Sequence, residues 1–514
     1  MKLATSAMIT KIDEYSQNVL GIPISTLMER SGEAVARVVR ERAPRDKHVV
    51  ILAGKGNNGA DGYAAAIKLM DEYDITVYDI FNVGQKNREG KEFLLEFKAR
   101  GGKVEGFEPS EEKLSYIKSA GCIVDAVFGT GFHGEMPEDI RPLAITVRES
   151  VEAQKIAVDV PLGINADNGS VSEFAIMVSA TVELSYIKPG IISYPARAYA
   201  GDIIYDDLGL PRSVLAEAFD FRYNMIDTYF VQRTLPKREN NSNKGSFGKL
   251  LMITGSQKYR GAAYLGLEAA LRGGVGLVSF AAIPDLIKEI STRFPEAVYK
   301  NIEDIAEGNN EQVEELTALS SKFSATLIGS GSDNTDGLLK LTLSLLSAEG
   351  GPLILDADAI NALSSMGEKG TLAIKNSPRE VIITPHPLEF ARLIGSDVAS
   401  VQLHRIEYAE RFAKENSCIV VLKGAGTIVT DGKDVHINTA GSSALAKAGS
   451  GDVLAGFMAS FIAQGKVNTI SAAALSVYFH AVAGDNLAEQ FSSYGVTPSD
   501  LPIEMARQIA KFER

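Results

Sequence analysis

The chain has 514 residues, of which 45% are hydrophobic and 23% are charged, and its formal net charge is −13. This length predicts more than one domain, since a domain usually holds roughly 100–200 residues. The acidic balance disfavours nucleic-acid binding but leaves small phosphorylated ligands open, because the N–H groups at helix N-termini bind phosphate without net positive charge.

Neither a disulfide framework nor a membrane span is expected. The two cysteines, Cys122 and Cys418, each begin an apolar run in a different half of the chain, and we expect both to be buried core residues. The apolar runs are all shorter than the roughly 20 residues of a membrane span. Lys11 and Asp13 interrupt the N-terminal apolar stretch that a secretory signal needs. We therefore expect a cytoplasmic protein with no membrane partner.

The first half alternates predicted helices and strands. Residues 1–45 are expected to be helical, because apolar side chains recur there at helical spacing. Strands are predicted at 48–54, 75–81, 122–128 and 155–160, and helices at 63–70 and 86–100. This alternation indicates a mostly parallel sheet, which binds ligands at the carboxyl ends of its strands.

A polar segment between about 222 and 246 separates this series from a second one. Strand-like runs follow at 249–255, 325–332, 352–361, 380–387, 418–426 and 427–432, and a helix is predicted at 449–464. We expect two α/β domains, residues 1–225 and residues 226–514, without an internal repeat in register.

Residues 54–62, GKGNNGADG, contain four glycines and two asparagines between a predicted strand and a predicted helix. Glycine lets a backbone approach a phosphate closely, and the helix that follows offers unpaired N–H donors. The segment matches neither the dinucleotide fingerprint nor the P-loop. From residue types alone, a ligand-binding loop and an ordinary turn both stay open.

Asp125 and Asp159 lie in apolar strand-like runs, where a carboxylate is rarely buried without a partner. Near the carboxyl ends of two strands, they predict either cation ligands or proton-transfer groups. A role in capping a helix or tying a loop is the alternative for each.

The segment AKAGSGDVLAG at 446–456 is the strongest indication of chemistry in the second half. Gly449 and Gly451 predict a turn whose N–H groups point along a new helix and bind an anion. Asp452 falls in the first helical turn, where the helix dipole favours its ionised form. There it can deprotonate a hydroxyl group that attacks phosphorus, and a simple helix cap is the alternative.

Two further residues in this half are candidates. Lys423, in KGAGT at 423–427, contacts a phosphate or is a solvated charge at a strand end. His386 lies between two prolines, a rigid turn that is unusual for a core histidine, and it predicts a ligand contact. The other histidines show no metal-ligand spacing, so a zinc site is unsupported.

Together these motifs resemble the bifunctional NAD(P)H-hydrate repair enzymes, which join an NAD(P)HX epimerase to an ADP-dependent NAD(P)HX dehydratase. The similar segments of the first half are 21–32, 54–62, 124–135, 158–169 and 181–190; those of the second are 244–265, 270–278, 356–363, 384–393, 423–427 and 438–456. The resemblance covers essentially the whole chain. It implies an N-terminal Rossmann-like three-layer α/β domain followed by a C-terminal ribokinase-like α/β domain.

For the first domain, the resemblance implies a potassium ion held partly by Asn58 and Asp125. It also implies that Asp159 is the acid/base that interconverts the R and S hydrates. Ala60 and Leu162 depart from the family pattern, which has glycine and serine at these positions. The residues implied to contact the hydrated substrate are Asn57, Asn58, Gly59, Ala60, Asp61, Gly129, Thr130, Gly131, Phe132, His133, Gly134, Glu135 and Asp159.

For the second domain, the resemblance implies that Ala262, Gly331, His386 and Asp452 face the hydrated nicotinamide nucleotide, with Asp452 as catalytic base. ADP, with Mg²⁺ as a candidate companion, would be the co-substrate. Leu388, Lys447 and Ala448 depart from the family pattern, as does the GSG turn at 329–331, and Lys447 would add a phosphate contact. The residues implied to bind the nucleotide are Lys423, Gly424, Ala425, Gly426, Thr427, Ser443, Ala444, Leu445, Ala446, Lys447, Ala448, Gly449, Ser450 and Gly451.

The expected function is therefore repair of hydrated NADH and NADPH by a homo-oligomeric enzyme. The alternative is a vitamin or sugar kinase of ribokinase-like fold that carries a nucleotide-sensing N-terminal domain.

Overall fold

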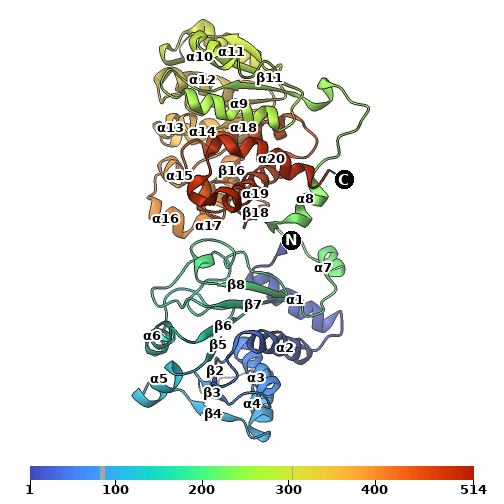
Figure 1. Cartoon of the computed structure of the whole chain (residues 1–514), viewed down its shortest axis with the longest axis vertical. Coiled ribbons are helices and arrows are strands. Elements are labelled where there is room, and N and C mark those ends of the chain that lie inside the picture. Colours follow the sequence, from blue (N-terminus) through green and yellow to red (C-terminus); the bar gives the residue numbers. More distant parts are fainter. Residues whose placement is uncertain (82–86, 304, 514) are drawn as a thin grey trace. The chain divides into compact units, whose positions relative to one another are not determined.

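The computed structural model describes residues 1–81, 87–303 and 305–513. They form two compact units, Lys2–Tyr223 and Asn224–Arg514, the second together with Met1 (Figure 1). Of the helix expected at 86–100, Lys86 lies outside the described residues. In the part of the chain that the structure describes, none of the helices is long and apolar enough to cross a membrane.

The first unit is built on a parallel sheet in the order β4-β3-β2-β5-β6-β7-β8. Because the chain leaves β2 toward β3 and β4, then returns to β5 on the other side, the order reverses between β2 and β5. The carboxyl ends of strands at such a reversal form a crevice that binds ligands. The strands are β2 Val49–Ala53, β3 Ile75–Asp79, β4 Lys103–Gly106, β5 Cys122–Ala126, β6 Gln154–Val158, β7 Ala180–Leu184 and β8 Asp202–Asp206.

Helices cover both faces of this sheet, which gives three layers. Side chains of α1 to α4 share one apolar core with the sheet, and those of α5 and α6 share a second core on the opposite face. Cys122 is buried in the first core, as expected. The helices are α1 Ser6–Asn18, α2 Ile24–Arg42, α3 Asn57–Leu69, α4 Arg88–Ala99, α5 Glu111–Lys118, α6 Arg141–Glu149 and α7 Arg212–Ala218, and a two-residue strand, β1 Lys2–Leu3, precedes them.

Two expectations for the first unit need correction. Residues 1–45 form two helices rather than one continuous helical region, because Gly21, with φ of 68°, and Pro23 interrupt the pattern between α1 and α2. Helix α3 begins at Asn57 rather than at Tyr63. The glycine-rich segment that looked like a loop therefore supplies the first turn of a helix.

The second unit contains a larger sheet in which β9-β18-β17-β16-β15-β14-β13-β10-β11-β12 are neighbours. From β18 to β12 the pairings are parallel except those of β17 with β16 and with β18, which are antiparallel. The order reverses between β10 and β13, which places a second ligand crevice there. The strands are β9 Tyr223–Ile226, β10 Lys249–Ile253, β11 Leu277–Ala282, β12 Val298–Asn301, β13 Ala325–Ile328, β14 Leu353–Leu355, β15 Val381–Ile383, β16 Ile419–Leu422, β17 Ile428–Thr430 and β18 Val435–Asn438.

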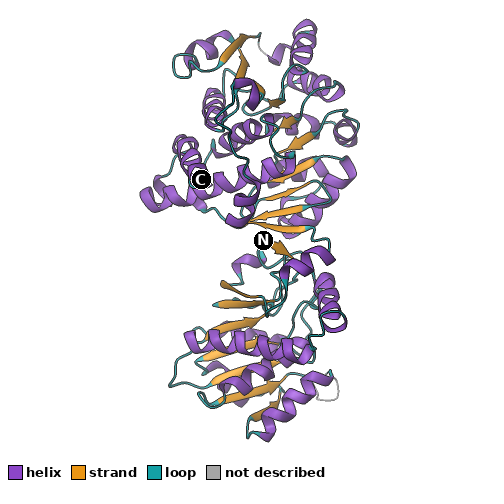
Figure 2. Ribbon diagram, turned by 90° about the vertical axis from the view of Figure 1, so that its right-hand side faces the viewer, coloured by secondary structure: helices purple, strands orange, loops and turns teal. Residues whose placement is uncertain are grey.

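Figure 2 shows helices on both sides of these strands as well. Helices α9, α18, α19 and α20 share one core with the sheet, and α18 is buried almost all round because it packs between α9 and α19. The helices are α8 Thr228–Thr234, α9 Arg260–Arg272, α10 Pro284–Ile290, α11 Asn310–Ser320, α12 Asp336–Ser347, α13 Asp358–Ser364, α14 Glu368–Lys375, α15 Pro387–Ile394, α16 Val398–Leu403, α17 Arg405–Asn416, α18 Ser450–Ala463, α19 Thr469–Gly495 and α20 Leu501–Ala510.

Two candidate active sites

The first candidate site lies where β2 and β5 end. Gly59, in the first turn of α3, passes so close to the end of β2 that a Cβ there would lie 2.1 Å from the Gly54 carbonyl oxygen. Only glycine fits this approach. Ala60 has helical backbone and is 1% exposed, so its methyl group is accommodated in the core. The substitution of alanine for the family's glycine therefore requires no left-handed backbone.

Asn58 connects the two loops at this reversal. Its Nδ2 donates to the Phe128 carbonyl oxygen at 2.8 Å. Its Oδ1 is buried and, among the described residues, has no hydrogen-bond partner. A buried amide oxygen without a donor is costly to leave unpaired, so this atom is available to a cation or a ligand donor.

Asp125 ties the loops after β5 and β6 together. Its Oδ2 accepts from the Leu162 N–H at 2.6 Å, and its Oδ1 accepts from the Val127 N–H at 3.2 Å. Burial raises the pKa of Asp125 to about 7, although both N–H groups favour the ionised form. A nearby cation would also favour that form. The structure thus shows the loop-tying contact, and the same carboxylate remains a candidate cation ligand.

Asp159 follows β6 in left-handed backbone, with φ of 66°. Its Oδ1 accepts from the ammonium of Lys188 and from the Leu184 N–H at 3.3 Å. The same ammonium donates to the Leu184 carbonyl oxygen at 3.0 Å and lies 3.2 Å from Glu183 Oε2. Sequence reasoning named Asp159 but missed Lys188 and Glu183, although Lys188 lies in the segment 181–190 that resembles the family.

Two more carboxyl groups interact electrostatically with Asp159. Burial, and then the charge of Asp159, raise the pKa of Asp13 in α1 to about 6. Burial and the charges of Asp159 and Asp13 raise the pKa of Asp61 well above its ordinary value. The site therefore holds carboxyl groups with raised pKa values near a carboxylate that is paired with an ammonium, an arrangement suited to proton transfer.

The segment 129–135 follows β5 and is mostly accessible. Gly131, Gly134 and Glu135 are exposed, and so is His133, whose Nδ1 lies 2.9 Å from Asn165 Nδ2. Phe132 is buried, and the Thr130 carbonyl oxygen accepts from the Ser6 hydroxyl at 3.0 Å. Helix α1 therefore borders this segment as well as contributing Asp13.

The second candidate site lies at the carboxyl ends of β10, β13, β14, β15 and β16. The buried carboxylate of Asp356, just after β14, accepts from the Lys423 ammonium at 3.0 Å, the Thr384 hydroxyl at 2.6 Å and the Ser330 hydroxyl at 2.8 Å. Lys423 is thus not a solvated charge at a strand end, because its ammonium is paired inside the site, and its contact with a phosphate stays a prediction. The central role of Asp356 was missed by sequence reasoning.

Asp452 occupies the first turn of α18, as expected. Burial, and then the charge of Asp356, raise the pKa of Asp452 to about 7, while Lys423 lowers it. The Lys423 ammonium also lies near Gly451, where a Cβ would be 3.4 Å from Nζ. A carboxylate, an ammonium and helix N–H groups therefore meet at the start of α18.

A buried histidine contacts the first residue of α18. Gly449 has φ of 98°, which begins α18 with left-handed backbone. His480 Nε2 lies 3.1 Å from the Ser450 hydroxyl and 3.0 Å from the Ser450 carbonyl oxygen. Burial lowers the pKa of His480 to about 4, so the imidazole is neutral near pH 7. His480 lies far along the chain from Ser450 and showed no motif of its own.

The segment 443–451 is only partly open. Ser443, Ala446 and Ala448 are exposed, Ala444 is buried, and the residues Ser443–Leu445 form a short 3-10 turn. The Lys447 ammonium donates to the carbonyl oxygens of Tyr494 (at 2.6 Å) and Val496. It contacts the end of α19 instead of pointing freely from the turn, so the expected phosphate contact would require these two bonds to break.

A buried guanidinium forms hydrogen bonds with the backbone of the KGAGT loop, residues 423–427. Arg405 donates to the carbonyl oxygens of Leu422 at 3.1 Å, Lys423 at 3.2 Å and Gly426 at 3.4 Å. Gly424 and Ala425 at the tip of the loop are exposed, and the Thr427 hydroxyl donates to the Gly424 carbonyl oxygen at 3.0 Å. Arg405 thus fixes a loop that presents backbone to solvent.

His386 caps α15 and is half-exposed. Its Nδ1 accepts from the N–H groups of Leu388 and Glu389, each at 3.2 Å, and its Nε2 lies 3.3 Å from Glu389 Oε1. Acceptance at Nδ1 leaves the proton on Nε2.

Elsewhere in the site Gly331 passes close to Ala262, since a Cβ on Gly331 would lie 2.6 Å from Ala262 Cβ. Gly331 and Ala262, two of the predicted substrate contacts, therefore both lie beside the reversal of strand order between β10 and β13.

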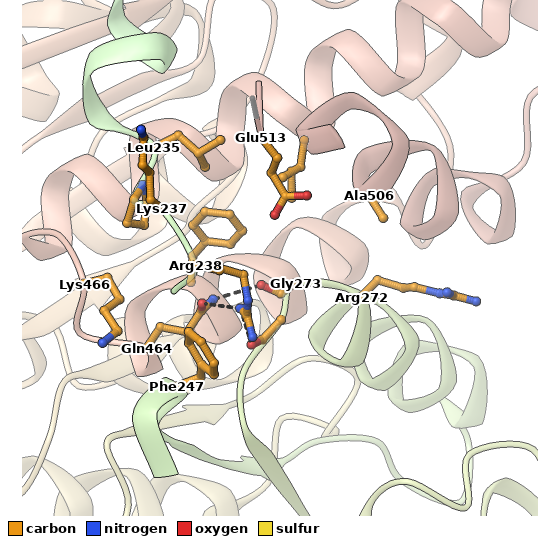
Figure 3. Close-up of a pocket in the computed structure, with 14 residues that line it drawn as sticks. Leu235, Lys237, Arg238, Phe247, Arg272, Gly273, Gln464, Lys466, Ala506 and Glu513 are labelled. Atoms are coloured by element: carbon orange, nitrogen blue, oxygen red, sulfur yellow. Dashed lines mark hydrogen bonds between the residues drawn. The ribbon is translucent and has the colours of Figure 1, made fainter. Parts of the chain in front are cut away.

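A surface pocket at the other end of the second unit contains none of the predicted site residues (Figure 3). Phe247 precedes β10, and Gly273 precedes β11, so the pocket lies at the amino ends of strands. Arg238 lies over the Phe247 ring, 3.5 Å from its centroid, and donates to Gln464 Oε1 at 3.0 Å. Figure 3 shows the Arg272 side chain pointing away from the pocket.

The family of the chain follows from comparisons with known proteins. A family model described as NAD(P)H-hydrate dehydratase matches residues 250–507, and one described as YjeF-related protein N-terminus matches residues 24–190. The bifunctional NAD(P)H-hydrate repair enzyme of Moorella thermoacetica is 30% identical over 98% of this chain and 95% of its own length. The chain belongs to the bifunctional NAD(P)H-hydrate repair enzyme family.

Other members of this repair enzyme family agree. The Escherichia coli enzyme is 30% identical over 96% of this chain and 91% of its own length. A crystal structure of an ADP/ATP-dependent NAD(P)H-hydrate dehydratase from Bacillus subtilis, co-crystallised with ATP and Mg²⁺, is 28% identical with a TM-score of 0.50. The match covers 56% of this chain and 99% of the Bacillus subtilis chain. The family and the two-part α/β fold predicted from the motifs are confirmed.

Proposed function

We propose that the first unit interconverts the R and S hydrates of NADH and NADPH, and that the second unit dehydrates the S hydrate at the expense of ADP. The observation that carries this proposal is the presence of two separate carboxylate–ammonium pairs, Asp159 with Lys188 and Asp356 with Lys423, each at the carboxyl ends of parallel strands. Each pair adjoins carboxyl groups whose pKa values are raised toward neutrality. Such groups give and take protons near pH 7.

In the first unit, a carboxyl group donates a proton to the hydroxyl group of the hydrate. The C–O bond breaks, water leaves, and the lone pair of the ring nitrogen forms a C=N bond. Water then adds to the opposite face, the nitrogen regains its electron pair, and Asp159 accepts the proton of the added water. Substrate would lie over the first turn of α3, over residues 129–135 and against Asp159, as the family resemblance implies.

Potassium fits the first unit. Asn58 Oδ1 is a buried oxygen without a donor, and Asp125 is a buried carboxylate on the strand that precedes the Asn58 partner Phe128. Oxygen atoms of amide and carboxylate groups suit hard cations. Among the described residues there is no cluster of His, Cys, Asp and Glu side chains that could hold a metal ion, so backbone carbonyl groups would complete the site. When bound, potassium would supply positive charge beside the substrate.

In the second unit, Asp452 removes the proton of the S hydrate hydroxyl as its oxygen attacks the β-phosphorus of ADP. AMP leaves, and the phosphorylated hydrate then loses phosphate, which is a far better leaving group than hydroxide. Loss of a ring proton restores NADH or NADPH. The N–H groups of residues 449–452 would bind the phosphate, since a helix N-terminus favours anions.

The nucleotide is proposed to lie between the KGAGT loop and residues 443–451, with Ala262, Gly331 and His386 facing the hydrated ring. The Bacillus subtilis relative was co-crystallised with ATP and Mg²⁺, so Mg²⁺ is a candidate companion of the nucleotide here too. A homo-oligomeric state and a cytoplasmic location remain predictions.

One assay tests the proposal. The purified chain is mixed with chemically hydrated NADPH and with ADP, ATP or no nucleotide, and recovery of the reduced-nicotinamide absorbance is followed. We expect recovery with nucleotide, release of phosphate, and consumption of both hydrates. A stable phosphorylated product without recovery of absorbance would instead favour the small-molecule kinase.

A further inference from the structure

We propose that Lys188 is a positioning residue of the first site, which pairs with the Asp159 carboxylate and directs one of its oxygens toward substrate. The inference rests on the proposed epimerisation and assigns a role to a residue that the motifs left without one.

The Lys188 side chain is 1% exposed, and its ammonium has an acceptor for each of its three N–H bonds: Asp159 Oδ1, Glu183 Oε2 and the Leu184 carbonyl oxygen. Burial alone would lower the pKa of Lys188, but Asp159 and Glu183 together raise it. A buried ammonium with all its donors satisfied is held in one place and stays charged.

The two carboxylates on this ammonium differ in access. The Glu183 side chain is completely buried, whereas the Asp159 side chain is 14% exposed. Asp159 Oδ1 is already occupied by Lys188 and by the Leu184 N–H. Among the described residues, no hydrogen-bond donor contacts Oδ2. The accessible oxygen is therefore the one that can exchange a proton with substrate.

The backbone around the pair is arranged for this contact. Asp159 and Ser185 both have left-handed backbone, with φ of 66° and 65°, which non-glycine residues adopt rarely. The Asp159 N–H donates to the Val182 carbonyl oxygen at 2.9 Å. Glu183 Oε2 also accepts from the Lys188 N–H at 3.3 Å, which folds the chain after β7 back over its own end. Two turns thus bring residues 29 positions apart into contact.

The charges around Asp159 explain why an ammonium is needed there. Asp13 from α1, Asp61 from α3 and Glu183 from β7 all interact electrostatically with Asp159, and burial together with the charge of Asp159 raises the pKa of each. Lys188 is the cation that these three groups share with Asp159. Without it, Asp13, Asp61 and Glu183 would lose the charge that lowers their pKa values, so the acidic cluster would take up protons at higher pH.

The test compares Lys188→Met with Lys155→Met, which removes an ammonium at the amino end of β6 in the same unit. Epimerisation of the R hydrate is measured from pH 5 to 9, and dehydration of the S hydrate by the second unit reports that the chain is folded. For Lys188→Met we expect kcat of epimerisation to fall roughly 100-fold or more, the acidic limb of its pH profile to move to higher pH, and dehydration to persist. Lys155→Met should keep the original profile.

An unchanged pH profile in folded Lys188→Met would overturn the assignment, as would equal loss of both activities with a lowered Tm in every lysine variant. A double variant limits the cost of the lost ammonium, because Asp159→Asn with Lys188→Met removes both charges of the pair and leaves only Glu183 without its cation. Its epimerisation rate should equal that of Asp159→Asn alone, and an additional loss would contradict action through Asp159. If the unaltered chain does not epimerise the hydrate at all, the proposed function fails instead.

Discussion

The Lys423 ammonium lies 3.0 Å from Asp356 Oδ1 and next to the turn that carries Asp452. Both carboxyl groups depend on this one cation. Lys423 is the buried partner of Asp356, and its charge lowers the pKa of Asp452, which the charge of Asp356 raises. The second site is therefore a coupled set of charges rather than a single base on a helix.

Replacement of Lys423 by methionine should impair the second site in two measurable ways. The pKa of Asp452, already raised to about 7, should rise further, so the acidic limb of the dehydratase pH profile should move to higher pH. Asp356 would lose its buried partner, which costs about 3–5 kcal/mol of unfolding free energy. pH–rate profiles and urea unfolding measure these effects, and Lys369→Met, at an exposed position, is the control. An acidic limb at the same pH in Lys423→Met and the unaltered chain would contradict the coupling.

Asp452→Asn should stop NADPH regeneration from the S hydrate, with a loss of roughly 100-fold or more in kcat. Because the pKa of Asp452 is about 7, the unaltered enzyme should lose rate below pH 7 as this base becomes protonated. Epimerisation by the first unit should continue in the variant, which shows that the chain is folded. Full dehydratase activity in Asp452→Asn would refute the base assignment.

His480 should make stability depend on pH. Its pKa falls from 6.5 to about 4 in the folded chain, so between these pH values the unfolded state binds more protons and folding weakens as pH falls. The linked loss is about 2 kcal/mol between pH 7 and pH 5. Urea unfolding of the unaltered chain and of His480→Gln at pH 5 and pH 7 measures it. The variant should show a smaller pH dependence and weaker nucleotide binding, and an equal pH dependence in both proteins would exclude the linkage.

Asn58→Ala should weaken any dependence of epimerisation on potassium. The substitution removes the buried Oδ1, the proposed ligand, together with the Nδ2 bond to Phe128. Rates are measured against KCl concentration at constant ionic strength, with LiCl as the replacing salt. We expect half-activation of the variant to require at least about tenfold more potassium, because one lost ligand interaction of about 1.4 kcal/mol is a factor of ten. If the rate of the variant depends on KCl concentration in the same way as that of the unaltered chain, Asn58 is not a potassium ligand.

The sequence alone determined the family, the alternation of strands and helices, and the candidate carboxylates Asp125, Asp159 and Asp452, because each of these is a local property of the chain. Short motifs specify their own turns, and apolar runs of strand length specify buried strands. The glycine-rich segment 54–62 was found for the same reason, although its helical first turn was not, since glycine and asparagine argue locally against a helix.

Only the tertiary structure decided the partners of these groups. Lys188 meets Asp159 across 29 positions, Lys423 meets Asp356 across 67, and His480 meets Ser450 across 30. Parallel strands bring distant segments together at their carboxyl ends, so no local pattern announces such pairs. Burial lowers the pKa of His480, whereas the neighbouring carboxylates raise the pKa values of Lys188 and Lys423 against the opposing effect of burial. Which residue is a base, which is an acid and which holds them in place is therefore a property of the folded sheet.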